Sequence, residues 1–197
     1  MQDPSPSAFA RLLVPHQELL VVLARRLVDH PDDAEDALQA ALGQAFRHRA
    51  HFEEGTSFRA WLACFLVNEA ANANRRRGRR REQGADALAA RPAPSPAPPD
   101  AAELEAELAW ERCLERPEEE LERLFEHLDG QLARALRGLG PSERSALLLR
   151  AVAGLSCAEI AGVLETPQGT VMSWLFRARR RLRASLLEAR GRPGGVT

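Results

Sequence analysis

The chain has 197 residues, of which 45% are hydrophobic and 5% aromatic, and its formal net charge is −1. This length allows one or two small domains, and the apolar fraction gives each of them enough material for a buried core. The longest unbroken apolar run, Trp61 to Val67, is far shorter than the roughly 20 residues that a bilayer span requires, so we expect no membrane insertion. The amino-terminal end lacks the basic and apolar regions of a signal peptide, and we expect a cytoplasmic protein.

The small net charge conceals blocks of opposite sign. Residues 75–81 carry six arginines and no acid, and residues 177–192 carry seven arginines and one glutamate. Between these blocks, residues 82–130 hold 14 acids against four arginines. Two basic blocks on either side of an acidic one indicate two surfaces that face polyanions, joined by a segment that avoids them.

The sequence offers no pattern typical of catalysis or metal binding. Cys64, Cys113 and Cys157 lie far apart without a CxxC pair, which argues against a disulfide framework or a metal cluster and fits a reducing cytoplasm. His48 and His51 lack a third ligand and are expected on the surface. Because there is also no glycine-rich phosphate loop, nucleophile elbow or pair of catalytic carboxylates, we predict no enzymatic activity and no cofactor.

The first helical block is expected to contain three helices. Apolar residues at helical spacing predict a helix from Phe9 to Val28. Residues 30–33 break the chain and start a second helix, whose acidic first turn complements the helix dipole and which runs to about His48. Thr56 or Ser57 can cap a third helix that ends in the arginine block. An apolar stripe of this third helix is formed by Phe58, Trp61, Leu62, Phe65 and Leu66.

An acidic connection follows. Residues 84–100 have the Ala/Pro/Ser composition of an extended linker. From Ala101 to about Phe125 the chain is rich in glutamate, and we expect a helix interrupted near Pro117. The whole of residues 84–127 is therefore predicted to be a flexible acidic linker.

The second helical block begins near residue 128. Helices are expected at about residues 130–137 and from Pro141 to Gly154. Ser156 and Glu159 have the spacing of a capping box for a short helix that ends near residue 164.

A turn of about three residues then starts the last helix. Thr166 is the expected N-cap and Pro167 the first helical residue. A short capped helix, a tight turn and a longer basic helix are typical of a helix-turn-helix motif. An apolar stripe of the last helix, opposite its arginines, is formed by Val171, Leu175, Ala178 and Leu182.

We therefore predict an all-α protein with no strand. Two small helical domains are joined by the linker, and the second is a helix-turn-helix domain. The predicted bounds are 1–83 for the first domain, 84–127 for the linker, 128–190 for the second domain and 191–197 for a flexible tail.

The last helix provides the first set of candidate DNA contacts. Its first turn would point at base edges and phosphates in the major groove, assisted by free backbone N–H groups and the helix dipole. The alternative for this segment is an ordinary helical hairpin with a solvated basic end. The candidate residues are Gln168, Gly169, Thr170, Ser173, Trp174 and Arg177.

The arginine block of the first domain provides the second set. Arginine–phosphate contacts supply affinity that does not depend on sequence, and two asparagines approach the block one helical turn apart. The alternative is a solvated charge run. The candidate residues are Asn68, Asn72, Arg75, Arg76 and Arg77.

The two blocks, in this order, resemble the two conserved domains of extracytoplasmic-function (ECF) sigma factors of bacterial RNA polymerase. Residues 33–39 resemble the acidic family segment that docks on the clamp helices of the β′ subunit. Residues 55–62, with Asn68 and the arginines, resemble the part that melts and reads the minus-ten promoter element. The segments that resemble the domain binding the minus-thirty-five element are residues 139–144, 148–150, 154–156, 159–161 and 169–179.

The resemblance implies an alternative sigma factor, without catalysis, that directs polymerase to promoters. Its implied partners are the β and β′ subunits of the polymerase core, promoter DNA and an inhibitory anti-sigma factor. The acidic linker would thread through the RNA path of the polymerase, a channel built for a polyanion. The implied core-binding residues are Asp33, Asp36, Leu38, Gln39 and Leu42.

The chain departs from the family pattern at several of these positions. Ala40 stands where the family has Glu, Phe46 where Trp is common and Asn72 where Asp is common, and the first two departures predict reduced core affinity. Met172 and Trp174 stand where basic residues are frequent, which removes two potential phosphate contacts.

Two other functions fit the same residues. One is a regulatory protein that docks on polymerase without selecting promoters, an alternative motivated by Met172 and Trp174. The other is a stand-alone helix-turn-helix repressor that never contacts polymerase. A stand-alone repressor should not co-purify with core polymerase, whereas the other two should. A regulatory protein without promoter selection would bind core but start no transcript in a reaction with purified core.

Overall fold

The structure, a computed structural model, describes residues 5–53, 55–84 and 129–190. The chain divides into two compact units, Met1–Pro98 and Pro99–Thr197. All regular structure in the described ranges is helical, without a strand among them, and the predicted all-α class is confirmed. The predicted linker beyond Gly84, with its glutamate-rich helix, and the predicted tail lie outside the described residues.

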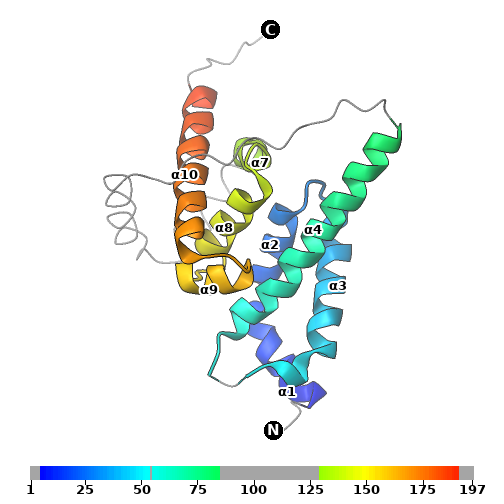
Figure 1. Ribbon diagram of the computed structural model, residues 1–197. Helices are drawn as coiled ribbons and strands as arrows, with labels where there is room; N and C mark the ends of the chain where they lie inside the picture. The colour runs from blue at the N-terminus through cyan, green and yellow to red at the C-terminus, as the bar shows by residue number, and fades with distance from the viewer. Residues whose placement is uncertain (1–4, 54, 85–128, 191–197) are drawn as a thin grey trace. The chain divides into compact units, whose positions relative to one another are not determined.

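The described residues of unit 1 form four α-helices and two short 3₁₀ turns (Figure 1). Ser57 caps the longest helix, since its Oγ accepts a hydrogen bond from the backbone N–H of Ala60 at 3.2 Å. Sequence analysis offered both Thr56 and Ser57 for this role, and the structure selects the second. The elements are α1 (Pro6–Leu13), η1 (Val14–His16), α2 (Gln17–Leu27), α3 (Asp33–Arg47), η2 (Arg49–His51) and α4 (Phe58–Gly84).

The expectation of one helix from Phe9 to Val28 is wrong. The chain forms α1, then the 3₁₀ turn η1, then α2. Pro15 lies inside η1, and a proline in a helix interior removes one N–H donor and clashes with the preceding turn. The first helix also begins earlier than expected, because Ser5 caps it through a 3.3 Å bond from the N–H of Ala8 to its Oγ.

By length and composition alone, Pro6–Leu27 is apolar enough to cross a membrane, with a mean hydropathy of 1.3 over its best window. This stretch is broken at Pro15, and its α2 half packs on α3 and α4. The apolar residues of α2 that are buried in unit 1 are Leu20, Leu23, Ala24 and Leu27. These side chains serve the core of a helical domain.

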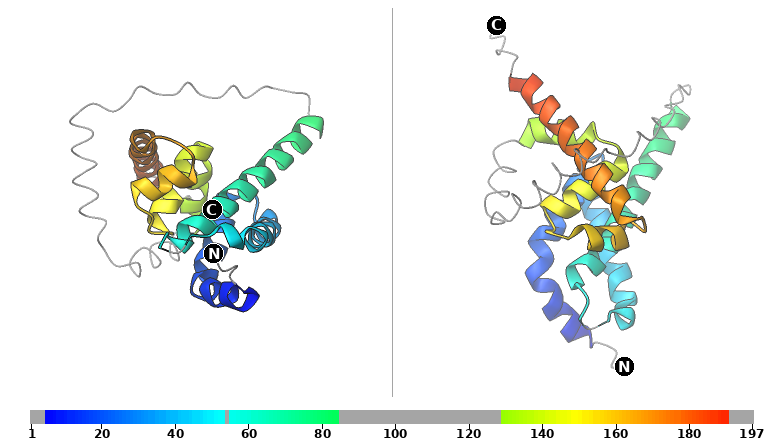
Figure 2. Two further views of the ribbon diagram at one scale, coloured as in Figure 1. Left: turned by 60° about the horizontal axis from the view of Figure 1, so that its bottom comes forward. Right: turned by 60° about the vertical axis from the view of Figure 1, so that its left-hand side comes forward.

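Helices α3 and α4 lie side by side and form the centre of unit 1 (Figure 2). The face of α3 toward the core carries only alanines at helical spacing, and such small side chains let a neighbouring helix approach closely. From α4, Leu62 and Leu66 are almost fully buried. The alanines of this face are Ala34, Ala37, Ala41 and Ala45.

The described residues of unit 2 form four helices around an aliphatic core. The capping box is confirmed: Ser156 Oγ accepts from the N–H of Glu159 at 3.2 Å, and Glu159 Oε2 accepts from the N–H of Ser156 at 2.8 Å. Val171, Leu175 and Ala178 of the last helix are buried, as the stripe predicted. The helices are α7 (Asp129–Arg137), α8 (Pro141–Ala151), α9 (Cys157–Val163) and α10 (Gln168–Arg190).

The turn between α9 and α10 is tight. Glu165 adopts a left-handed conformation with φ of +49°, and the N–H of Thr166 donates to the carbonyl of Ala161 at 3.0 Å. This closes α9 with a bond of the Schellman type. Helix α10 starts one residue later than expected, because the carbonyl of Pro167 accepts the bond from the N–H of Val171. Pro167 is therefore the capping residue in place of Thr166.

Candidate polymerase and nucleic-acid surfaces

The outer face of α3 carries the predicted core-binding residues. Asp36 and Gln39 are exposed, while Leu38 and Leu42 are half-buried. Gln39 Nε2 donates to Glu35 Oε1 at 3.1 Å, which orders this face along one helical turn. The face is thus acidic at its start and apolar in its middle.

Phe46 extends the same face by one turn beyond Leu42. The residue is 40% exposed, which is unusual for a phenylalanine, and its ring contacts the ring of Phe9 edge-on. The guanidinium of Arg49 lies 4.6 Å from the ring centroid of Phe46. Phe46 was predicted only as a departure from the family pattern, although its i, i+4 spacing from Leu42 places it on this surface.

Asp33, the first of the predicted core-binding residues, is paired with Arg77, one of the predicted phosphate contacts. Arg77 Nε donates to Asp33 Oδ2 at 2.7 Å, and both side chains are half-buried. The hydrogen bond from Arg77 lowers the pKa of Asp33, and the same bond raises the pKa of Arg77. The two surfaces proposed from sequence therefore meet at this ion pair.

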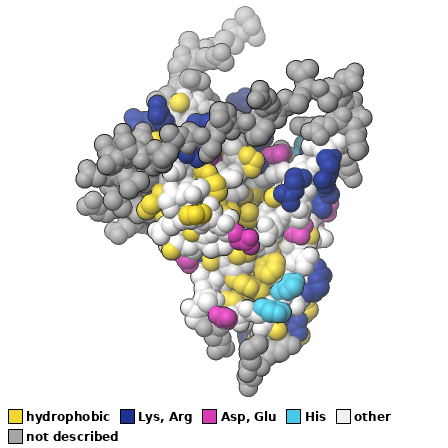
Figure 3. Space-filling model, viewed as in Figure 1, with side chains coloured by type: hydrophobic (Ala, Val, Ile, Leu, Met, Phe, Trp, Pro, Cys, Tyr) yellow, Lys and Arg dark blue, Asp and Glu magenta, His cyan; other side chains and the backbone are white. Residues whose placement is uncertain are grey.

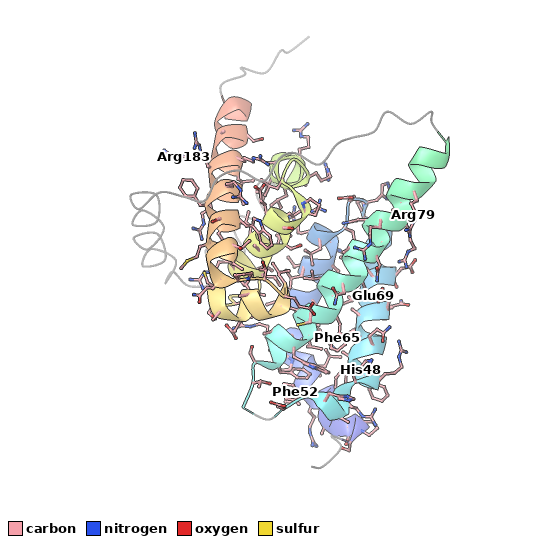
Figure 4. All side chains as sticks on the ribbon, in the orientation of Figure 1. His48, Phe52, Phe65, Glu69, Arg79 and Arg183 are labelled. Carbon is pink, nitrogen blue, oxygen red and sulfur yellow. The ribbon has the colours of Figure 1, made fainter. Side chains whose placement is uncertain are left out.

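The other predicted contacts of α4 are accessible. Asn68, Arg75 and Arg76 are exposed, and Asn72 is half-buried. Arg75 Nη2 donates to Asn72 Oδ1, so the asparagine orients the arginine one turn ahead of it. Figure 3 shows basic side chains gathered over the distal half of α4, and Figure 4 labels Arg79 there.

Asn74 has a structural role that the sequence did not reveal. Its Nδ2 donates to the carbonyl of Leu27 at 3.0 Å, and its Oδ1 accepts from the N–H of Asp29 at 2.7 Å. This side chain satisfies two backbone groups at the end of α2, which would otherwise lack helical partners. Asn74 thereby fixes α2 to α4 next to the arginine block.

Aromatic side chains cluster at the beginning of α4. Phe52 contacts Trp61, Trp61 contacts Phe65 with centroids 4.9 Å apart, and His48 stacks on Phe65 (Figure 4). His48 and His51 are both exposed, as expected. Among the described residues, no group of three side chains is placed to bind a metal ion. The half-buried rings offer faces of the kind on which unpaired bases stack.

In unit 2, the first turn of α10 is open to solvent. Gln168 and Gly169 are exposed, and Thr170 and Trp174 are half-buried. Ser173 Oγ donates to the carbonyl of Gly169 at 3.0 Å and is thereby oriented within the helix. The N-terminal turn of a helix presents backbone N–H groups, and together with these polar side chains it can donate hydrogen bonds to a phosphate or a base edge.

The face of α10 opposite its buried stripe adds an apolar residue to the candidate set. Helical spacing from Val171 and Leu175 puts Ser173 and Phe176 on this face, and Phe176 is half-buried although nothing apolar is expected there. Sequence analysis missed Phe176. A helical wheel centred on the buried stripe would have found it.

Arg177, another predicted contact of α10, is bonded to a side chain of a different helix of the unit. Its Nε donates to Glu143 Oε1 at 3.0 Å, and its side chain is only 16% exposed. Arg181 Nη1 donates to the other oxygen of the same carboxylate, also at 3.0 Å. Sequence analysis gave no role to Glu143, a residue of α8.

Comparisons with known proteins match both units. The family model "Sigma-70 region 2" matches residues 12–80, and "Sigma-70, region 4" matches residues 129–182. The RNA polymerase sigma-H factor of Pseudomonas aeruginosa is 31% identical over 179 residues, which are 91% of this chain and 86% of that protein. The ECF RNA polymerase sigma-E factor of Escherichia coli K12 is 31% identical over 180 residues, with the same shares covered.

Solved structures match over most of the chain. The sigma factor RpoE of Bartonella quintana, solved in complex with the anti-sigma factor NepR, gives a TM-score of 0.65 at 26% identity and covers 91% of this chain and 96% of its own. CnrH, solved in complex with the cytosolic domain of CnrY, gives a TM-score of 0.58 at 25% identity. The match covers 93% of this chain and 89% of CnrH.

A polymerase-docking region followed by a helix-turn-helix region defines a bacterial transcription initiation factor. The chain belongs to the ECF family of RNA polymerase sigma factors. It is an alternative sigma factor that directs transcription initiation. Members of this family are non-enzymatic, soluble transcription regulators, consistent with the expected cytoplasmic location.

Proposed function

We propose that unit 1 holds core polymerase and the opened minus-ten strand, while unit 2 binds the duplex at the minus-thirty-five element. The observation that carries this division is the charge pattern of the two long helices. Helices α4 and α10, one in each unit, both expose arginines, whereas the outer face of α3 is acidic and apolar. Each unit thus has a surface for polyanions, and among the described residues α3 of unit 1 adds the acidic and apolar surface expected to dock on polymerase.

The core-binding surface consists of the outer face of α3. Its exposed acids suit the basic surface of a partner, and the apolar middle supplies area that can be buried on docking. Phe46, at 40% exposure, is the residue with the most apolar surface to lose there. The residues that we assign to this surface are Asp33, Asp36, Leu38, Gln39, Leu42 and Phe46.

The minus-ten surface lies on α4. Asn68 and Asn72 would bond flipped bases, and Arg75 and Arg76 would hold the phosphates. Arg77 belongs to this surface as well, although its Nε is committed to Asp33. Its terminal nitrogens would serve a phosphate while the pair with Asp33 stays in place.

The minus-thirty-five surface is the first half of α10, which would enter the major groove. The first turn would contact phosphates and base edges, and Phe176 would add an apolar contact to a thymine methyl group. Splitting weak contacts between two tethered units gives high effective concentration only on correctly spaced elements. The residues assigned to this surface are Gln168, Gly169, Thr170, Ser173, Trp174, Phe176 and Arg177.

We further propose an anti-sigma partner, because the two solved structures above are complexes, one with the anti-sigma factor NepR and the other with the cytosolic domain of CnrY. The chain has no catalytic activity of its own in this account, and it associates with the nucleoid when polymerase carries it there.

The proposal is tested with purified core polymerase. We expect the full chain to co-purify with core at low salt and to start a discrete run-off transcript from a promoter fragment. A chain that binds core yet starts no transcript would be a regulator without promoter selection. A chain that binds DNA but never core would be a stand-alone repressor, and either result would contradict the proposal.

A further inference from the structure

Glu143 is a buried carboxylate that faces two arginines of the helix proposed to bind DNA. It stands in the first turn of α8, with a side chain only 9% exposed. Burial of a carboxylate is unfavourable unless hydrogen-bond donors compensate it. Arg177 Nε and Arg181 Nη1 both donate at 3.0 Å, and the N–H of Gly140 donates at 3.4 Å. The carboxylate therefore links α8 to the middle of α10.

The two arginines lie one above the other on α10, since they are four residues apart. Thr170 and Trp174 continue the same flank toward the first turn of the helix, at spacings of three and four residues. Each oxygen of Glu143 takes one arginine, so both guanidinium groups are oriented before any DNA arrives. The bond to Arg177 uses Nε, which leaves the N–H groups on its two terminal nitrogens for other acceptors.

We propose that Glu143 is a positioning residue for recognition of the upstream promoter element, a role that rests on the proposed function of α10. It holds Arg177 and Arg181 in the geometry that the specific complex requires. It also compensates part of their positive charge and so limits their pairing with the phosphates of any sequence. Glu143 thereby raises the ratio of specific to nonspecific affinity.

The expected loss of specific affinity on removing Glu143 follows from the free-energy cost of ordering long side chains. Immobilising two arginines only at the moment of binding corresponds to about a tenfold loss of specific affinity. Nonspecific binding tolerates many arrangements and does not bear this loss. Removing the carboxylate also frees positive charge, and one additional phosphate contact steepens the slope of log K against log salt by about 0.9.

The experiment uses holoenzyme reconstituted from core and the full chain. One duplex probe carries the upstream element of a promoter mapped with the wild-type holoenzyme, and the other is a shuffled duplex of the same composition. For Glu143→Gln we expect the affinity ratio between the probes to fall about tenfold and the salt slope on the shuffled probe to steepen. The matched control, Glu165→Gln, removes an exposed acid of the same unit and should change the ratio by less than about twofold.

A double-mutant cycle separates positioning from general stability. In an Arg177→Ala background, the fall in the ratio caused by Glu143→Gln should shrink from about tenfold to about threefold, because only Arg181 is left to be positioned. If circular dichroism shows that Glu143→Gln unfolds unit 2, the variant Arg181→Gln tests the inference in its place. The Arg181 side chain is 51% exposed, so we expect its replacement to leave the unit folded. This variant should lower the ratio about threefold.

An unchanged ratio in folded Glu143→Gln, or in Arg181→Gln where that variant decides, overturns the inference. A fall that persists undiminished in the Arg177→Ala background also overturns it. If wild-type holoenzyme initiates no transcript, the proposed function fails instead, and the two failures are thereby distinguished.

Discussion

Replacing Asn74 by alanine tests whether its side chain fixes α2 to α4. The side chain is half-buried and makes two bonds, one with the carbonyl of Leu27 and one with the N–H of Asp29. At about 0.5–1.5 kcal/mol for each bond, the variant should lose about 1–3 kcal/mol of stability in unit 1. Asn72→Ala is the matched control, because the side chain of Asn72 accepts an exposed bond from Arg75, and its loss should cost less than about 0.5 kcal/mol.

Hydrogen exchange of the full chain, resolved by peptide, measures this effect in unit 1 alone. Protection of the α2 and α4 amides should fall about 5- to 100-fold in Asn74→Ala, and protection of α8 and α9 should stay unchanged. Asn72→Ala should leave all four helices protected while weakening promoter opening. Equal loss of protection in the two variants would refute the structural role of Asn74.

The ion pair between Asp33 and Arg77 should make unit 1 sensitive to acid. The pKa of Asp33 is lowered in the folded chain, so the pair stabilises fully above the unfolded pKa and the stabilisation is lost as pH falls through the folded value. The acid-unfolding curve below about pH 4 should therefore flatten in Asp33→Asn; an identical curve would show that the pair contributes nothing. Phe46→Ala should weaken association with core polymerase about tenfold in a pull-down titration without unfolding the chain, since Phe46 is already 40% exposed. Full affinity in that variant would remove Phe46 from the docking surface. Thr170→Ala combined with Arg177→Ala should weaken binding of the upstream element about 10- to 100-fold and spare core association. An equal loss of core association would contradict the division of labour between the units.

Local features of the fold could be predicted because the responsible residues are neighbours in sequence. The capping box needs only Ser156 and Glu159, three positions apart, and the buried stripe of α10 follows from helical spacing alone. The break at Pro15 is equally local. It was missed because the apolar periodicity of the flanking residues outweighed a single proline, whose missing N–H decides the conformation.

Contacts between helices could not be predicted in this way. Arg77 and Asp33 are 44 residues apart, and Arg177 and Glu143 are 34 apart. Arginine patterns in the sequence indicate a basic surface, but they do not show which guanidinium groups will form hydrogen bonds with a carboxylate of the same unit. The sequence therefore indicated the helices that carry the proposed sites, while tertiary packing determines which of their arginines are bonded internally.

Mapping of transcript start sites tests the central claim most directly. The purified full chain is combined with core polymerase free of other sigma factors, on total genomic DNA of the source organism. The account predicts a small set of start sites that share two sequence elements at a fixed spacing, one for each unit. Start sites without a shared upstream element, or no start sites above those of core alone, would contradict it.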